Sequence, residues 1–312
     1  MPFDKFVKEL DVDRNVSGRC YHLKARCGEL NGYVMTCGSR ERVLAAKELL
    51  EKPRVVGDNR GLTVVNGIYK NAPITLLCSG MGPSSTEISY TELLFNIDFS
   101  KFLRPTIIRA GTAGSWHSKV KPNDFVIETG VVRNEGTSTK IAPIEWPAVP
   151  DFLTNLIIYE TAIKLKLDKR VHLGIGICKD TLYADEDPTK RSAVGNEIKL
   201  KQKAYESLGA LSTSMESAPF TVLTDFYNKQ FFEHGLDVKI SFSCILLVVS
   251  PYYAQTSGVE FVVSEKAEVE LEKLGLESLA RKYALDRMYL EGKKTNTVDI
   301  DSVLKFLYKS SN

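Results

Sequence analysis

Short apolar runs alternate along the chain with amphipathic segments, and this alternation predicts its secondary structure. Apolar runs typical of strands occupy residues 32–37, 54–56, 62–70, 73–78, 106–110, 125–132, 171–178, 209–214 and 238–249. Segments in which apolar positions recur every three or four residues predict helices at 42–52, 84–95, 151–163, 215–227 and 264–283. Ser84 and Glu87 match a capping box at the start of one helix, and Pro219 falls in the first turn of another.

This order of elements predicts the fold class and the domain organisation. Strands separated by helices of this length indicate an α/β fold, with a central mixed sheet flanked by helices. Because no internal repeat or flexible linker interrupts them, we expect a single domain over residues 1–290. Beyond a polar stretch, Ile300, Val303, Leu304 and Leu307 form an apolar stripe. We therefore expect residues 291–312 to hold a linker and a short amphipathic helix.

The composition is that of an ordinary globular protein, with 43% hydrophobic and 26% charged residues. Lysine and arginine (41) nearly balance aspartate and glutamate (39), so the net charge of +2 gives no bulk attraction to nucleic acid or to an anionic membrane. No apolar window is long enough for a membrane span, and the N-terminal segment has no apolar signal core. These features favour a cytoplasmic protein without nucleic-acid or membrane partners.

Cysteine and histidine usage gives no indication of a metal site. The six cysteines are scattered through mostly apolar runs without a CxxC pair, and the four histidines are far apart in sequence. This pattern is typical of reduced core thiols in a cytosolic protein. We expect neither a bound metal nor a cofactor.

The stretch 105–114, PTIIRAGTAG, is the most informative candidate for a binding site. Arg109 stands near the end of an apolar strand, directly before a predicted glycine loop that contains Thr112. A guanidinium offers a forked donor that matches phosphate or carboxylate, and glycines allow successive backbone amides to approach an anion. The segment therefore predicts an oxyanion site; the alternative is an ordinary turn with a surface arginine.

Other segments carry comparable chemistry. Residues 38–42 read GSRER after a strand, residues 57–60 read GDNR, and Met215 and Glu216 stand near a predicted helix start. Together with residues 79–84 (SGMGPS), 109–114 and 142–152 (APIEWPAVPDF), and in this order, they resemble the nucleoside phosphorylase family. The resemblance covers roughly residues 20–285 and points to the branch that contains uridine phosphorylases and hexameric purine nucleoside phosphorylases. The 142–152 stretch looks like the uridine phosphorylase side.

The resemblance implies a phosphorylase/hydrolase-like fold and a reversible phosphorolysis, in which a nucleoside and inorganic phosphate give the free base and ribose 1-phosphate. Phosphate is the co-substrate, and no metal is implied. The residues that match the family's phosphate site are Gly38, Arg42, Arg109 and Thr112, with Arg60 reaching in from a neighbouring subunit.

The resemblance also implies a ribose site and a shared subunit interface. Glu216 would accept hydrogen bonds from the ribose hydroxyls and, with Arg109, carry the catalysis, while Met215 would pack against the sugar. His22 matches a histidine that family members offer to the 5′-hydroxyl of a partner's substrate. We therefore expect a homo-oligomer, at least a dimer, with shared active sites.

The base site departs from the family pattern. Where uracil-cleaving members carry Gln-x-Arg, this chain has Glu186 and Pro188, and Leu182 stands at the position of a stacking aromatic residue. Leu182 and Glu186 are thus the candidate base contacts, with Lys190 or Arg191 as alternative donors.

Two further positions depart from relatives. The first glutamate of the family's Glu-Met-Glu run is Ser214, and the aspartate that protonates purines in the purine branch is missing after Ser250. Uridine is the first candidate substrate. The alternatives are a purine or broad-specificity phosphorylase, a nucleosidase that uses water, and a non-catalytic nucleoside-binding protein.

Overall fold

The computed structural model describes residue 6, residues 9–251 and residues 264–292. Its strands are β1 (Tyr33–Cys37), β2 (Glu51–Asn59), β3 (Leu62–Tyr69), β4 (Ala72–Cys78), β5 (Thr106–Ser115), β6 (Phe125–Asn134), β7 (Val171–Lys179), β8 (Ser212–Ser214) and β9 (Ser241–Ser250). Its helices are α2 (Arg40–Lys47), α3 (Pro83–Leu94), α4 (Phe152–Lys164), α5 (Tyr183–Glu186), α6 (Pro188–Arg191), α7 (Gly195–Ser207), α8 (Ser217–Glu233) and α9 (Glu265–Leu290).

The strands form one mixed sheet in the order β2-β3-β4-β1-β5-β8-β7-β6-β9. Because β9 also pairs with β5, strands β5, β8, β7, β6 and β9 close into a ring, while β1 to β4 extend from it as an open sheet. The predicted α/β fold with a central mixed sheet is confirmed. The carboxyl ends of the parallel neighbours β1 and β5 lie near the end of β7, because residues at all three ends line one cavity.

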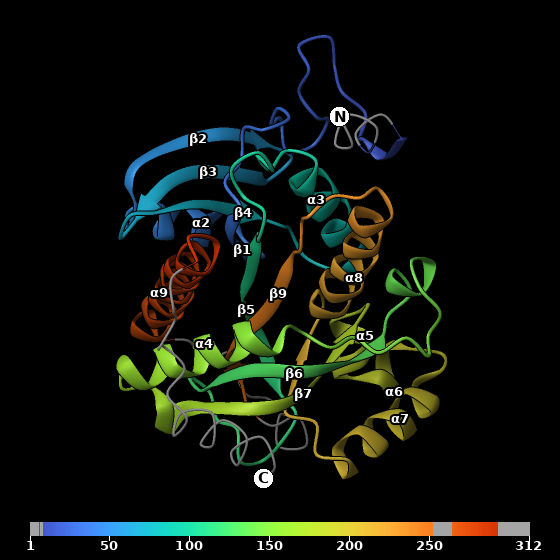
Figure 1. The fold of residues 1–312 in the computed structure, drawn as a ribbon. Coiled ribbons are helices and arrows are strands. Elements are labelled where there is room, and N and C mark those ends of the chain that lie inside the picture. Colours follow the sequence, from blue (N-terminus) through green and yellow to red (C-terminus); the bar gives the residue numbers. More distant parts are fainter. Residues whose placement is uncertain (1–5, 7–8, 252–263, 293–312) are drawn as a thin grey trace.

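Helices cover both faces of the sheet, as Figure 1 shows. On one side, α3 and α8 pack against the sheet through a core that contains Tyr90 and Phe220. On the other side, α2, α4 and α9 pack through a second core that contains Val43 and Leu156. Adjacent residues of β5, such as Ile107 and Ile108, belong to different cores because successive side chains of a strand point to opposite faces.

Several predicted boundaries are wrong. The helix expected at 42–52 ends at Lys47, because the chain enters β2 at Glu51 and Glu51 pairs with Ile68 of β3. Pro53 lies in this strand and disfavours helical backbone at the residue before it. The strand expected at 54–56 is therefore the middle of a longer one.

Other differences lie at helix starts. No side chain caps α3, whose N-cap is Gly82 with Pro83 in the first turn, so the capping box at Ser84 is not used. The helix expected at 215–227 runs over Ser217–Glu233, which leaves Met215 and Glu216 in front of it. Pro219 does fall in its first turn.

One strand is shorter than expected and three helices were not predicted. The strand expected at 209–214 covers only Ser212–Ser214, and the helices missing from the prediction are α5, α6 and α7.

The cysteines form no disulfide bond. All six cysteines are free, and all but Cys27 are buried. None of the described helices has an apolar stretch sufficient to cross a bilayer. The amphipathic helix expected around residues 300–308 lies outside the described residues.

Candidate functional site

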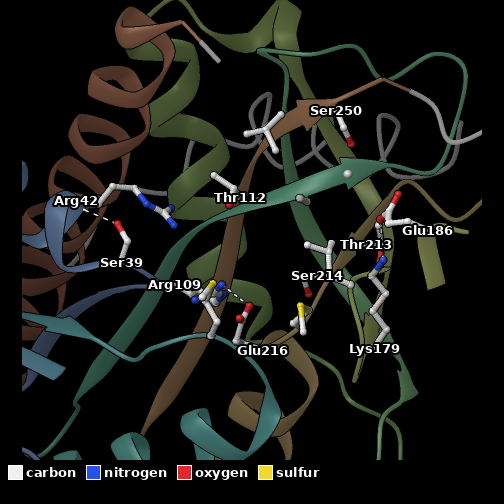
Figure 2. Close-up of a pocket in the computed structure, with 17 residues that line it drawn as sticks. Ser39, Arg42, Arg109, Thr112, Lys179, Glu186, Thr213, Ser214, Glu216 and Ser250 are labelled. Atoms are coloured by element: carbon white, nitrogen blue, oxygen red, sulfur yellow. Dashed lines mark hydrogen bonds and ion pairs between the residues drawn. The ribbon is translucent and has the colours of Figure 1, made fainter. Parts of the chain in front are cut away.

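A cavity of about 200 Å³ lies where the carboxyl ends of β1, β5 and β7 meet β8 and β9. In open α/β sheets, ligands bind at such strand ends. Its walls include most of the predicted site residues, as Figure 2 shows. The lining residues are Gly38, Ser39, Arg42, Met81, Arg109, Thr112, Ala113, Gly114, Lys179, Leu182, Glu186, Thr213, Ser214, Met215, Glu216, Val249 and Ser250.

One end of the cavity is formed by two arginines from different elements. Arg109 of β5 is buried, with 2% of its surface exposed, and Arg42 of α2 approaches it across Gly38. A Cβ atom at Gly38 would lie 3.6 Å from Arg42 Nη2 and 3.9 Å from Arg109 Nη2. Gly38 therefore keeps the space between the two guanidinium groups open. The predicted convergence of Gly38, Arg42 and Arg109 on one cavity is observed.

The predicted glycine loop after Arg109 is a strand. β5 continues to Ser115 because β9 pairs with it along this stretch, with Gly111 opposite Leu246. A Cβ atom at Gly111 would lie 3.0 Å from Arg109 Nε, so the glycine gives the arginine side chain room. Arg109 and Thr112, which the sequence predicted to bind an anion, therefore lie on a strand and not beside a glycine loop.

Arg109 and Glu216 form a buried ion pair in the wall of the cavity. Arg109 Nη2 donates to Glu216 Oε2, and the backbone N–H of Gly82 donates to Glu216 Oε1 at 2.9 Å. Burial is the largest single influence on the pKa of Arg109 and lowers it, but the Glu216 carboxylate and the neighbouring cysteines together outweigh burial, so the net pKa is raised and the arginine stays charged. Although Glu216 directly precedes α8, only 4% of its surface is exposed.

Several buried donors in this region have no partner within the described part of the chain. Arg109 Nε and Nη1 and Thr213 Oγ1 make no hydrogen bond. Buried polar atoms are nearly always paired, because an unpaired one costs about 1–3 kcal/mol. An oxyanion bound beside Arg109 would give the unpaired guanidinium donors a partner. The arrangement thus offers two cations for an anion, with a carboxylate beside them.

The opposite end of the cavity is formed by residues at the end of β7 and on α5. Lys179 Nζ donates to Glu186 Oε1 at 2.8 Å, and the Lys179 side chain is only 4% exposed. Leu182 lines the same end. Figure 2 shows this pair on the opposite side of the view from Arg42, with Arg109 and Glu216 below. Both predicted base contacts, Leu182 and Glu186, therefore lie in the cavity.

Neither alternative donor proposed from the sequence reaches the cavity. Lys190 pairs with Asp187 at 3.2 Å with its side chain 81% exposed, and Arg191 lies over the Tyr183 ring. The donor at this end is Lys179, which sequence reasoning missed. The available signal was a charged residue at the end of the apolar run 171–178.

His22 and Arg60 do not line the cavity but lie together elsewhere on the chain. His22 Nδ1 is 2.7 Å from Glu92 Oε1, and Arg60 stacks on Tyr21 at 5.3 Å from the ring centroid. Tyr21 also contacts the His22 ring edge-on, at 4.9 Å between centroids. The two residues predicted to act on a neighbour's site therefore share one surface. Within the described residues, no group of three His, Cys, Asp or Glu side chains could hold a metal ion.

The sequence pattern that defines the phosphorylase superfamily matches residues 33–234. The chain belongs to the phosphorylase superfamily. The matched region contains every residue that lines the cavity except Val249 and Ser250. The cavity is therefore formed almost entirely by the part of the chain that defines the superfamily.

Individual superfamily members resemble the chain over most of its length. The uridine phosphorylase of Treponema pallidum is 29% identical over 240 residues, which cover 77% of this chain and 85% of that protein. The guanosine phosphorylase of Halorubrum lacusprofundi is 29% identical over 168 residues, or 53% of this chain and 66% of that protein. A crystal structure of Vibrio fischeri uridine phosphorylase with 6-hydroxy-1-naphthoic acid shares the fold, with a TM-score of 0.64 and 24% identity over 86% of this chain and 97% of that one.

Proposed function

We propose that the protein catalyses the reversible phosphorolysis of a nucleoside, with uridine as the first substrate to test. The observation that carries the proposal is the buried Arg109, which lines one cavity together with Arg42 and Glu216 and keeps guanidinium donors that have no partner among the described residues. The similarity to uridine phosphorylases supports the same reaction class. Such an enzyme is a pentosyltransferase, and we propose a role in nucleoside salvage.

The cavity offers separate places for the phosphate, the ribose and the base. Phosphate binds between Arg42 and Arg109 with Thr112 beside it, the ribose lies against Met215 and Glu216, and the base lies toward Leu182 and Glu186. A phosphate oxygen forms the new bond to C1′ as the bond from C1′ to the base nitrogen breaks. The electron pair of the broken bond leaves with the base.

The charges of the site favour this displacement. The sugar gains positive charge as its bond to the base weakens, as in glycoside hydrolysis. The Glu216 carboxylate lines the cavity and stabilises that charge, while the arginines hold the nucleophile in place. Phosphate itself is the nucleophile, so we expect no protein nucleophile, metal or cofactor.

We further propose a homodimer in the cytoplasm with active sites shared between subunits. His22 and Arg60 lie outside the cavity but on one common surface, which supports a role in a partner's site. The free cysteines are consistent with a reducing compartment.

The test is a panel of uridine, inosine, guanosine, cytidine and adenosine, incubated with the purified protein with and without inorganic phosphate. The expected result is base release that requires phosphate and produces ribose 1-phosphate, with uridine turned over best. Guanosine is the second candidate, because a guanosine phosphorylase is among the similar proteins. Release that is unchanged without phosphate would instead identify a nucleosidase, and phosphate-dependent release of no base would contradict the proposal.

A further inference from the structure

Lys179 and Glu186 form an ion pair at the base end of the cavity, and the reaction outlined above gives Lys179 no role. Both side chains line the cavity, and they are joined at 2.8 Å between Lys179 Nζ and Glu186 Oε1. The Lys179 side chain is 4% exposed and the Glu186 side chain 35%. A lysine is rarely buried to this degree, and its stem fixes the ammonium group at the cavity wall.

The pair leaves hydrogen-bonding capacity for a ligand. An ammonium group has three donors, and one of those of Lys179 goes to Glu186. The carboxylate of Glu186 uses Oε1 for this bond, so Oε2 remains as an acceptor. A ligand at this end therefore meets a positively charged donor next to a negatively charged acceptor.

We propose that Lys179 and Glu186 select nucleosides whose base carries a ring N–H next to a carbonyl group. Glu186 accepts the hydrogen bond of the ring N–H, and Lys179 donates to the adjacent carbonyl oxygen. Uracil, thymine, hypoxanthine and guanine have this edge. The inference rests on the proposed phosphorolysis and names its substrate class.

Cytosine and adenine have the opposite pattern at the same positions. Their ring nitrogen is an acceptor, so it would face the Glu186 carboxylate without a proton between them. The base cannot shift to avoid this, because the ribose and phosphate ends of the cavity hold the rest of the nucleoside. A site whose charged groups are left unpaired rejects the wrong ligand strongly.

Lys179 also assists departure of the base. When the bond from C1′ to the base nitrogen breaks, the electron pair is delocalised onto the carbonyl oxygens of the base. A buried ammonium group beside one of these oxygens stabilises the new negative charge. This contribution replaces the donors absent from the Gln-x-Arg positions, which Glu186 and Pro188 occupy in this chain.

The experiment compares Lys179→Met, Glu186→Gln and the control Lys190→Met, which alters an exposed lysine on the neighbouring helix. For Lys179→Met we expect kcat/KM for uridine to fall about 100-fold while the KM for phosphate changes less than twofold. For Glu186→Gln we expect the preference for uridine over cytidine to narrow, because an amide can donate to the cytosine ring nitrogen. Lys190→Met should behave as the unchanged protein.

Two results would overturn the inference. One is an equal fall in uridine and cytidine turnover in Lys179→Met, which is what a purely structural ion pair predicts. The other is an unchanged protein that cleaves cytidine and adenosine as fast as uridine and inosine.

Binding of the free bases separates this inference from the proposed reaction. Calorimetry with uracil and with cytosine, in the presence of phosphate, needs no turnover. If no nucleoside is cleaved but uracil binds more tightly than cytosine and loses this advantage in Lys179→Met, the reaction is wrong and the base selection stands. If nucleosides are cleaved but the two bases bind alike, the base selection is wrong and the reaction stands.

Discussion

Arg109 combines a buried positive charge with donors that have no partner in the described chain. Burial of such a group costs free energy unless a ligand pairs with its donors, because unpaired buried donors lose their hydrogen bonds to water. Glu216 provides a partner for Nη2, whereas Nε and Nη1 have none among the described residues. A lysine at this position would keep the charge but would lose the planar fork.

We therefore expect Arg109→Lys to fold and to raise the KM for phosphate at least tenfold, because one ammonium cannot bind phosphate and Glu216 in the same bidentate geometry. Initial rates measured over a range of phosphate concentrations give this value. The control is Arg104→Lys, which alters an arginine paired with Asp237 outside the cavity. Equal phosphate KM values in both variants would show that Arg109 does not bind phosphate.

Glu128 of β6 is a fully buried carboxylate behind the site. Ser212 Oγ donates to Glu128 Oε1 at 3.2 Å, whereas Oε2 has no partner among the described residues. Burial raises its pKa from 4.5 to about 7, despite opposing hydrogen bonds from neighbouring side chains. A Cβ atom at Gly176 would lie 1.7 Å from Glu128 Oε1, so glycine is required opposite this side chain.

The raised pKa of Glu128 predicts how the stability of the protein changes with pH. Between about pH 4.5 and 7 the folded chain keeps a proton on Glu128 that the unfolded chain has released, so the free energy of unfolding falls as pH rises through this window. Glu128→Gln stays neutral, and we expect it to be increasingly more stable than the unchanged protein over that window, by at most about 3 kcal/mol.

Urea unfolding from pH 4.5 to 8.5 measures the difference between the two proteins at each pH. The exposed Glu197→Gln on α7 serves as the control, and its difference should not change with pH. A difference for Glu128→Gln that is the same at every pH would show that Glu128 is charged throughout.

Much of the site could be predicted from single residues, because the arginine end is encoded by local motifs. Gly38 and Arg42 follow one strand, Arg109 lies in another, and Glu216 precedes a helix, so each position can be recognised from its neighbours in sequence. Lys179 offered a similar local signal, a charged residue at the end of an apolar run, but neither its burial nor its partner could be recognised in this way. Its burial depends on how α5 packs over the end of β7, which no local pattern specifies.

At the scale of elements, predictions succeeded where apolar periodicity was strong and failed where it was weak. α5 and α6 have four residues each, which is too short for any period to appear. α7 buries only Gly195 and Gln202, so it shows no apolar stripe. The strand predicted at 106–110 ended before Gly111, because glycine weakens a strand. In the structure, pairing with β9 extends β5 beyond this glycine.

Strand β2 is held close to the segment that carries Tyr21 and His22. A Cβ atom at Gly57 would lie 1.9 Å from the backbone oxygen of Leu23. We expect Gly57→Ala to lower the free energy of unfolding by about 1–3 kcal/mol, because one of the two backbones must move. Gly136→Ala is the control, since its Cβ would meet only Asp180 Oδ2 at 3.7 Å. Chemical denaturation of both variants checks this, and equal stabilities would contradict it.

At the scale of the molecule, the described chain brings the cavity residues together but leaves His22 and Arg60 apart from them. The sequence could place these two residues only through resemblance, because no periodicity or spacing reveals a contact between subunits. Their common surface around Tyr21 is consistent with that placement. A test in a mixed dimer distinguishes action on the same chain from action on the partner.

We expect activity to reappear when Arg60→Ala is unfolded and refolded together with the double variant Arg109→Met/Glu216→Gln. In a mixed dimer, one site then has an intact cavity and an intact Arg60 from the other chain, so random assortment restores about a quarter of normal activity. Each variant refolded alone is the control. No recovery in the mixture would place Arg60 on its own chain's site or remove it from catalysis.

The two ends of the cavity are built by different stretches of the chain. Arg42 and Arg109 come from α2 and β5, whereas the residues at the other end, Lys179, Leu182 and Glu186, all lie within residues 179–186. Exchange of that short stretch with the matching one from a relative should therefore transfer the preference for a leaving group as a unit.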